Sequence, residues 1–385
     1  MSEIKVNSIK GVAASSAAIT VNNTDGTCTA NITNNLSNRN LIINGAMKVA
    51  QRGTSFADSA SGSYTLDRFL IQNSSGTPAF TITQDTDAPI GFNDSLKVAC
   101  TTADASPAAG SFSRIRYSVE AQDLQPLAKG TSSAKASTLS FYVKTNKTGV
   151  YTVFVFDDDN TRMMSASYTV SDTNWNRYTI SIPADTTGAL ANDNGAGYVI
   201  HWGLSLGSNR TSGSLQTSWG SYAQGNEHVG NVNFADNTSN VWAITGVQLE
   251  VGSVATDFEH RSYAKELALC QRYYEKSYRY EDAVGSSSNN DGNIDICLGS
   301  NSSGTVVYHL RFFKEKRANP TVTVYRPDTG ASGEWLYGRS GLNSDYASVT
   351  VDSFSTKSCR TYFGIGSHNY KVAFLQGHYT AEAEL

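Results

Sequence analysis

Between residues 41 and 260, apolar and polar side chains alternate in short runs that turn-forming residues separate. Because successive side chains of a β-strand point to opposite faces, a period of two predicts strands with one buried face. The runs that show it cover residues 41–45, 64–71, 79–83, 111–117, 139–144, 150–156, 175–182, 198–204 and 241–250. About nine to ten strands without a helical period favour a two-sheet β-sandwich or jelly roll.

Residues 256–280 break this alternation. Thr256 and Glu259 have the spacing of a capping box, in which each side chain satisfies a backbone N–H at the start of a helix. The apolar positions that follow recur at helical intervals, at Tyr263, Leu267, Cys270 and Tyr274. The segment therefore predicts a helix that links two β domains.

The two ends of the chain differ in character. Alternation returns after residue 280, which predicts a smaller C-terminal β domain over residues 281–385. Residues 1–40 contain no Phe, Tyr or Trp and cannot bury a core of their own. They form either a loose tail or an extended arm that docks into an assembly or intertwines with copies of itself. The predicted order is an arm (1–40), a jelly roll (41–255), a linking helix (256–280) and a β tip (281–385).

Composition narrows the class of protein. The chain has 385 residues, enough for two to three domains of about 150 residues each. Charged residues make up 17% and aromatic residues 10%, and the net charge is −4. Intrinsic disorder requires more charge and fewer aromatic residues, and a nucleic-acid partner usually requires a basic surplus. We therefore expect a folded, β-rich protein that binds no nucleic acid.

The sequence also suggests where the protein is made. Its first residues contain no apolar stretch, which predicts synthesis in a cytoplasm without a secretory signal. The longest apolar run, residues 150–156, is far shorter than the ~18 residues of a membrane span, so no membrane insertion is expected. The cysteines lack the spacing of a disulfide framework or zinc site, and we expect small buried residues at Cys28, Cys100, Cys270, Cys297 and Cys359.

One short motif resembles a catalytic one. Gly203, Ser205 and Gly207 match the G-x-S-x-G pattern of a nucleophile elbow, which requires a strand, a turn and then a helix. Residues 208–213 favour a loop, so the pattern is more typical of an ordinary strand. No phosphate-binding glycine motif occurs, and we expect no cofactor and no enzymatic activity. Two carboxylates that folding brings together could still form a glycosidase site.

The densest group of carboxylates is Asp157, Asp158 and Asp159. Hard cations such as Ca²⁺ prefer several oxygen ligands, so this group is a candidate calcium site. An EF-hand loop needs Gly at its sixth position, where this sequence has Arg162. A solvated hairpin turn is the favoured interpretation, and calcium is the lesser one.

Aromatic side chains among small polar residues are the candidate glycan-binding groups. Trp219 and Tyr222 lie in one such stretch, and Trp335 and Tyr337 lie in another between Gly and Ser turns. A sugar ring stacks its apolar face on an aromatic ring while its hydroxyl groups form hydrogen bonds. The alternative is that these rings fill subunit contacts or cap the end of a sandwich. The two interpretations are balanced for Trp335, and the second is favoured for Trp219.

Several segments together indicate a family. The sequence has NLIINGAM at 40–47 with QRG at 51–53 and YTLDRF at 64–69, ITGVQLEVG at 244–252 with ATDFEHRSY at 255–263 and ELALCQRYY at 266–274, and YTAEAEL at 379–385. Together they resemble tail-fibre and appendage proteins of tailed bacteriophages, including cyanophage types. The second group is the longest and most specific. Asp257 stands where the family commonly has Pro.

The resemblance implies a structural virion protein of the tail. It implies a carbohydrate-binding-module-like jelly roll, a distal β tip and a homotrimer. Residues 1–40 would dock onto other tail or virion proteins, and the β domains would contact host-surface polysaccharide.

Two further functions stay open at this point. One is a purely architectural head fibre or connector that binds no glycan, which a glycan array distinguishes from a receptor-binding fibre. The other is a tailspike-like polysaccharide depolymerase, which would release reducing ends from host polysaccharide.

Overall fold

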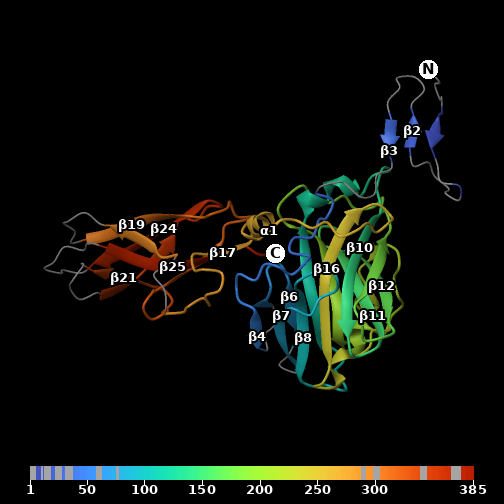
Figure 1. Cartoon of the computed structure of the whole chain (residues 1–385), viewed down its shortest axis with the longest axis horizontal. Coiled ribbons are helices and arrows are strands. Elements are labelled where there is room, and N and C mark those ends of the chain that lie inside the picture. The colour runs from blue at the N-terminus through green and yellow to red at the C-terminus, as the bar shows by residue number, and fades with distance from the viewer. Residues whose placement is uncertain are drawn as a thin grey trace.

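The computed structural model describes residues 6–9, 12, 19–21, 28–30, 38–57, 63–74, 78–287, 292–297, 304–338, 345–365 and 374–385. Strands dominate this part of the chain, so the all-β class expected from the alternation is confirmed (Figure 1). The 3-10 helices are η1 (Ala121–Leu127), η2 (Ser208–Arg210), η3 (Gln224–Asn226) and η4 (Phe234–Asp236). None of the helices in the described part has the length and apolarity needed to span a bilayer.

Two antiparallel sheets form a jelly-roll sandwich. The β10 sheet has the order β13-β10-β16-β8-β7-β4 and the β14 sheet has the order β15-β12-β11-β14-β9-β6-β5. The β10 sheet consists of β4 (Ser55–Ala57), β7 (Ala79–Asp85), β8 (Ser95–Thr102), β10 (Ser137–Thr145), β13 (Asn176–Ile182) and β16 (Val241–Val251). The β14 sheet consists of β5 (Ser63–Tyr64), β6 (Leu70–Asn73), β9 (Phe112–Glu120), β11 (Gly149–Asp157), β12 (Arg162–Val170), β14 (Ala196–Leu206) and β15 (Gly220–Ser221).

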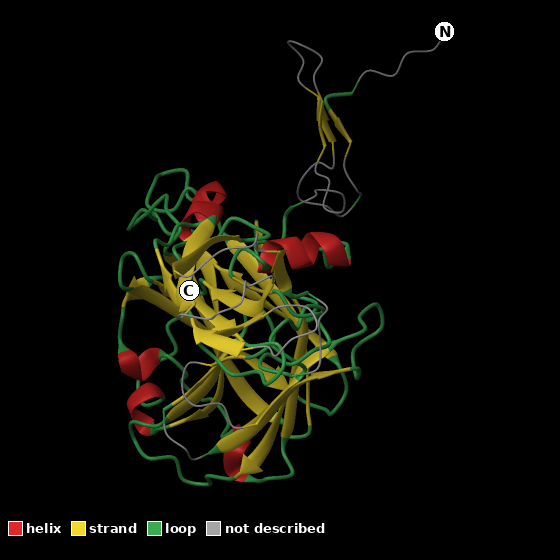
Figure 2. Ribbon diagram, turned by 90° about the vertical axis from the view of Figure 1, so that its left-hand side faces the viewer, coloured by secondary structure: helices red, strands yellow, loops and turns green. Residues whose placement is uncertain are grey.

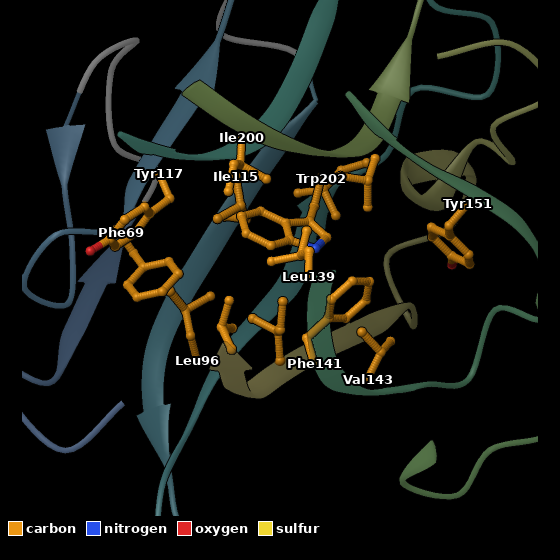
Figure 3. Close-up of a cluster of buried hydrophobic side chains, with 14 of the residues drawn as sticks. Phe69, Leu96, Ile115, Tyr117, Leu139, Phe141, Val143, Tyr151, Ile200 and Trp202 are labelled. Carbon is orange, nitrogen blue, oxygen red and sulfur yellow. The ribbon is translucent and has the colours of Figure 1, made fainter. Parts of the chain in front are cut away.

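The core lies between the two sheets (Figure 3). Phe141 of β10 and Trp202 of β14 meet there edge to face, with ring centroids 5.8 Å apart. Both side chains are fully buried, and each large apolar side chain buried in this way contributes roughly 1.5–3 kcal/mol. On β10 the neighbours Tyr142 and Lys144 point out of the core, as the period of two predicts.

Some strand predictions were wrong. Residues 41–45 form bends and turns, and residues 64–71 divide between β5 and β6 at a turn where Arg68 has φ +73°. Strands β8 and β12 were not predicted, although Leu96, Val98 and Cys100 alternate into the core. The G-x-S-x-G motif runs through β14 from Gly203 to Leu206, as expected of an ordinary strand.

The C-terminal part folds around strand β25 (Phe374–Glu382), which pairs with β17, β18, β20 and β21. The strands of this sheet are β17 (Tyr274–Lys276), β18 (Ile294–Cys297), β20 (Thr321–Tyr325), β21 (Glu334–Gly338) and β22 (Asp345–Ser348). A second sheet has the order β19-β24-β23, with β19 (Gly304–Arg311), β23 (Thr350–Asp352) and β24 (Ser358–Ile365). The three cysteines described at side-chain level, Cys100, Cys270 and Cys359, are free and buried.

The linking helix is much shorter than predicted. Helix α1 covers Tyr263–Cys270, and its N-cap is Ser262, whose hydroxyl accepts a hydrogen bond from the Lys265 N–H. The predicted capping box does not cap a helix, because its side chains form tertiary contacts. The Thr256 hydroxyl donates to Glu250 at 2.6 Å, and Glu259 accepts from the backbone N–H of Asn40 at 2.8 Å.

Little of residues 1–40 lies within the described part. The strands β1 (Ser8–Ile9), β2 (Ile19–Val21) and β3 (Cys28–Ala30) form a small antiparallel sheet. This sheet stands apart from the sandwich in both views (Figures 1 and 2). The described residues of this segment therefore include local sheet structure.

Buried charges join the sandwich to the C-terminal part. Arg68, with 1% of its side chain exposed, forms an ion pair with Glu384, and its guanidinium carbon lies 3.4 Å from the ring centroid of Tyr273. Arg52 lies 3.3 Å from the same carboxylate and 3.8 Å from the ring centroid of Tyr274. We call these five residues the junction network.

Further bonds fix the same junction. The Gln51 side chain donates to Asp67 at 2.6 Å and to the Tyr274 carbonyl at 2.8 Å. Arg272 donates two hydrogen bonds of 2.8 Å to Glu120, at the end of β9. Burial disfavours ionisation of Glu120, but the bonds from Arg272 and Tyr273 outweigh it and lower the pKa of this carboxyl. Together with the junction network, these bonds connect the two parts.

Replacing Glu384 tests how strongly the junction depends on its buried charge. Glu384→Gln leaves Arg68 buried without a carboxylate partner, and such a loss costs about 3–5 kcal/mol. We expect that loss in the free energy of unfolding, measured by hydrogen exchange in β25. Glu281→Gln is the control, because Glu281 pairs with Arg279 at 3.6 Å on the surface, where a pair contributes about 0–1 kcal/mol. Equal losses in the two variants would contradict the role of the network.

Candidate functional site

Aromatic side chains gather on the outer side of the β10 sheet. The ring centroid of Phe92, between β7 and β8, lies 5.4 Å from that of Tyr142 and 5.0 Å from that of Phe258. His260 completes the group, 4.9 Å from Phe258. With Trp175 these residues form what we call the aromatic face. Trp175, Tyr142, Phe92 and Phe258 are half-buried and His260 is exposed.

A glycine makes this arrangement possible. Gly246 of β16 has φ +62°, and a Cβ atom there would lie 2.8 Å from both the Phe92 and the Tyr142 rings. Any other side chain at this position would push the two rings off the sheet. The left-handed backbone and the close approach of the rings both require glycine.

Polar groups hold Trp175 in place. Its indole N–H donates to Asp87 at 3.0 Å, and the Lys144 ammonium donates to the other oxygen of the same carboxylate at 2.7 Å. These two hydrogen bonds, that from Lys144 above all, lower the pKa of Asp87. The Lys144 and Asp87 side chains are 37% and 54% exposed. A carboxylate and an ammonium group are therefore available to a ligand beside the indole ring.

This combination suits a small polar ligand that has one apolar face. An aromatic plane can pack against the C–H face of a sugar ring, while the charged groups accept and donate hydrogen bonds to hydroxyl groups. Sequence reasoning did not select Trp175 and Tyr142, which it assigned only to strands. Strand parity was the missed signal, because Ile180 and Ile182 point inward and Trp175 therefore shares the outward parity of Arg177.

Two of the candidate glycan-binding residues, Trp335 and Tyr337, are buried. The side chain of Trp335 is 0% exposed and that of Tyr337 is 4% exposed, and both lie in the C-terminal core. The Trp335 indole packs onto Gly377 of β25, where a Cβ atom would lie 2.0 Å from the ring. Its N–H donates to the His378 carbonyl at 3.2 Å. Neither ring presents a face to a ligand.

The other predicted pair lies on the sandwich and does not join the first. Trp219 is half-buried, its N–H donates to the Pro183 carbonyl at 2.9 Å, and its ring lies 5.2 Å from that of Tyr198. Tyr222 is 39% exposed, and its hydroxyl donates to Glu227 at 2.6 Å. The packing of Trp219 against Tyr198 agrees with the structural interpretation that the sequence favoured.

The three aspartates form a hairpin turn between β11 and β12. The buried Asp157 carboxylate lies 2.5 Å from the Lys129 ammonium, which neutralises it, and it accepts a hydrogen bond from Asn160. Asp159 accepts from the Ala191 N–H at 2.9 Å, while Asp158 is exposed. In the described ranges, no three His, Cys, Asp or Glu side chains are grouped to hold a metal ion. The hairpin turn is confirmed.

The outer side of the β14 sheet is covered. Residues 207–233 fold back over it, where Glu227 accepts from Arg114 at 3.1 Å and from Arg210 at 2.5 Å. His228 packs against Phe154, and His201 stacks on the same ring at 5.0 Å. Of the two outer faces of the sandwich, the β10 sheet therefore carries the more accessible aromatic group.

Solved structures give distant likenesses. A putative sugar binding protein from Bacteroides thetaiotaomicron is 12% identical, with 55% of this chain and 99% of that one covered and a TM-score of 0.31. The tandem CBM22 domains from Paenibacillus barcinonensis are 8% identical, with 93% of each chain covered and a TM-score of 0.29. A family 11 carbohydrate-binding module from Clostridium thermocellum is 12% identical, with 54% and 99% covered and a TM-score of 0.27. No protein-family model and no curated protein matches the chain.

Two of the buried histidines, His201 and His228, make stability depend on pH. Burial, together with the nearby Arg114, lowers the pKa of His201 and of His228 well below 6.5. Below about pH 6.5, His201 and His228 bind protons in the unfolded chain but stay neutral in the folded chain. The free energy of unfolding therefore falls as the pH falls. The slope approaches about 1.4 kcal/mol per pH unit for each histidine.

His201→Phe removes one of these groups and keeps the stacking on Phe154. We expect the slope between pH 6.0 and pH 5.0 to fall by about half of the combined contribution of His201 and His228. Urea unfolding of the variant and the original chain at both pH values measures it. An unchanged slope would show that His201 does not stay neutral in the folded protein.

Proposed function

We propose that this chain is a glycan-binding structural protein of a tailed-bacteriophage particle, a tail fibre or a similar appendage. The aromatic face is the observation that carries the glycan-binding part. Its half-exposed Trp175 lies beside the exposed Asp87–Lys144 pair, so apolar stacking and hydrogen bonding are available at one place. Both are needed to bind a sugar ring in water.

The resemblance of the sequence to phage appendages supports the second part. Its segments are far apart in the chain but meet in space. The Asn44 N–H donates to Glu266, the Gln51 side chain donates to the Tyr274 carbonyl, and Arg68 pairs with Glu384 at the end of the third segment. The residues that carry the resemblance therefore form one unit, which holds the C-terminal part at a fixed angle. A fixed angle suits an appendage that presents one domain to a surface while another is anchored.

In this proposal residues 1–40 attach the chain to other tail or virion proteins, and three chains associate. Association multiplies weak sugar sites, because once one site is bound the others act at a high effective concentration. The protein would be made in the host cytoplasm and act in the tail of the virion. No catalytic step is part of the proposal.

Trp175→Ala tests the aromatic face. Removing the ring exposes about 60 Å² of apolar ligand surface, which at about 25 cal/mol per Å² weakens binding roughly tenfold. Binding of host-surface polysaccharide is measured first on a glycan array and then by calorimetry with the best ligand.

Trp219→Ala is the matched control, because Trp219 is also a half-buried indole of the sandwich with one hydrogen bond from its N–H. We expect it to bind as the original chain does. Loss of binding only in Trp219→Ala would place the site there and contradict the aromatic face. Release of reducing ends from the polysaccharide would contradict a purely binding role.

The oligomer has a separate test. Light scattering after size-exclusion chromatography should give three times the chain mass of 41.4 kDa at micromolar concentration. A chain that starts at Asn38 should lose affinity for virion particles that lack the protein, while its glycan affinity per chain is kept. A stable monomer would contradict the trimer.

A further inference from the structure

A cleft opens where the sandwich meets the C-terminal part, and the last residue, Leu385, is among those that line it. Its volume is about 530 Å³, within the range of small-ligand sites. Strands β5, β6 and β9 form one wall, and β25 and the residues before β20 form the other. The lining side chains that can form hydrogen bonds are Tyr64, Gln72, Arg116, Arg317, Asn319, Thr321, Glu382 and Glu384.

Arg116 is the first of two cations in this cleft. It lies on β9 between Ile115 and Tyr117, which both point into the core, so its own side chain points outward. It is half-buried. Among the residues that the structure describes, no carboxylate lies within 4.0 Å of its guanidinium. Its charge is therefore available to a ligand.

Arg317 is the second cation. Its three nitrogens donate to the carbonyls of Ala383 at 2.9 Å, Asn194 at 2.8 Å and Glu384 at 2.9 Å. These bonds fix the position of the guanidinium between the two parts. Because carbonyl groups are neutral, its positive charge is not cancelled.

The acidic groups around the cleft are already paired. Glu384 binds Arg68 and lies 3.3 Å from Arg52, and Glu382 lies 3.6 Å from Arg52.

Behind them, Asp67 accepts hydrogen bonds from Gln51 and faces Arg52. Among the described residues, Arg116 and Arg317 have no carboxylate partner within 4.0 Å, and both line the cleft.

We propose that this cleft binds a carboxylate-bearing sugar residue, such as a uronic acid of an acidic polysaccharide. Arg116 pairs with the carboxylate, because a guanidinium presents two parallel N–H donors that match its oxygens. Gln72, Asn319 and Tyr64 also line the cleft. The Gln72 Oε1 already accepts from Arg114 at 2.9 Å and the Tyr64 hydroxyl donates to the Leu385 carbonyl, so the Gln72 amide N–H groups and the Asn319 side chain would bind the sugar hydroxyl groups. The inference rests on the proposed glycan-binding function and adds a second site of different chemistry.

The test compares three probes on the full chain by calorimetry, which are glucuronate, glucose and inorganic phosphate. We expect glucuronate to bind and glucose not to bind at the same concentrations. Arg116→Gln should weaken glucuronate binding at least tenfold while the thermal unfolding midpoint is unchanged. Arg311→Gln makes the same change in net charge at an exposed position of β19 and should bind glucuronate as the original chain does.

Two outcomes overturn the inference. Equal glucuronate affinity in Arg116→Gln and the original chain removes Arg116 from the site. Phosphate that binds as tightly as glucuronate shows a general anion site and no sugar specificity. Trp175→Ala separates the two sites, since it should leave glucuronate binding intact. If that variant keeps all polysaccharide binding while Arg116→Gln weakens glucuronate, only the aromatic face fails.

Discussion

The ion pair between Arg68 and Glu384 is the constraint on which the rest of the structure depends. Arg68 adopts a left-handed backbone conformation at a tight turn, and its guanidinium is taken out of water between Tyr117 and Tyr273. A buried cation needs a partner, and the partner comes from the last strand region of the chain. The sandwich therefore reaches its full stability only when the C-terminal part is in place, although 316 residues separate the two members of the pair.

This dependence decides which surfaces remain for ligands. Tyr273 and Tyr274 pack against arginines in the junction, and Trp335 is buried in the C-terminal core. Residues 207–233 cover the outer side of the β14 sheet. Among the described residues of the sandwich, the aromatic face of the β10 sheet stays accessible, as does the ring of Tyr222. The junction itself creates the cleft, because a cleft between two parts can persist only where their relative position is fixed. Both candidate sites are thus consequences of how the domains pack.

Local patterns explain why the sequence predicted the fold better than the site. Alternation depends on neighbours along one strand, so most strands of the sandwich could be predicted. The predicted helix start is wrong because the Thr256 hydroxyl donates to Glu250 and Glu259 accepts from the Asn40 N–H. These contacts depend on the folded structure, and a capping pattern in the sequence does not reveal them. Trp335 looked exposed between Gly and Ser turns, but pairing of β21 with β25 buries it against Gly377. Whether an aromatic side chain is buried depends on strand pairing between distant segments. Because only an accessible side chain can contact a ligand, the site could not be predicted from local patterns.

Ligand binding at the two candidate sites depends on different forces, the removal of apolar surface from water at one and an unpaired charge that salt screens at the other. At the aromatic face the Asp87 and Lys144 charges cancel, so binding there depends mainly on removing apolar surface from water. In the cleft, Arg116 has no carboxylate partner among the described residues, so binding depends on a charge that salt screens over about 8–10 Å. One chain that contacts a polysaccharide through both would recognise its neutral sugars by shape and its acidic sugars by charge. Discrimination between polysaccharides then follows from the spacing of acidic residues along the polymer, because only a matching spacing engages both sites at once.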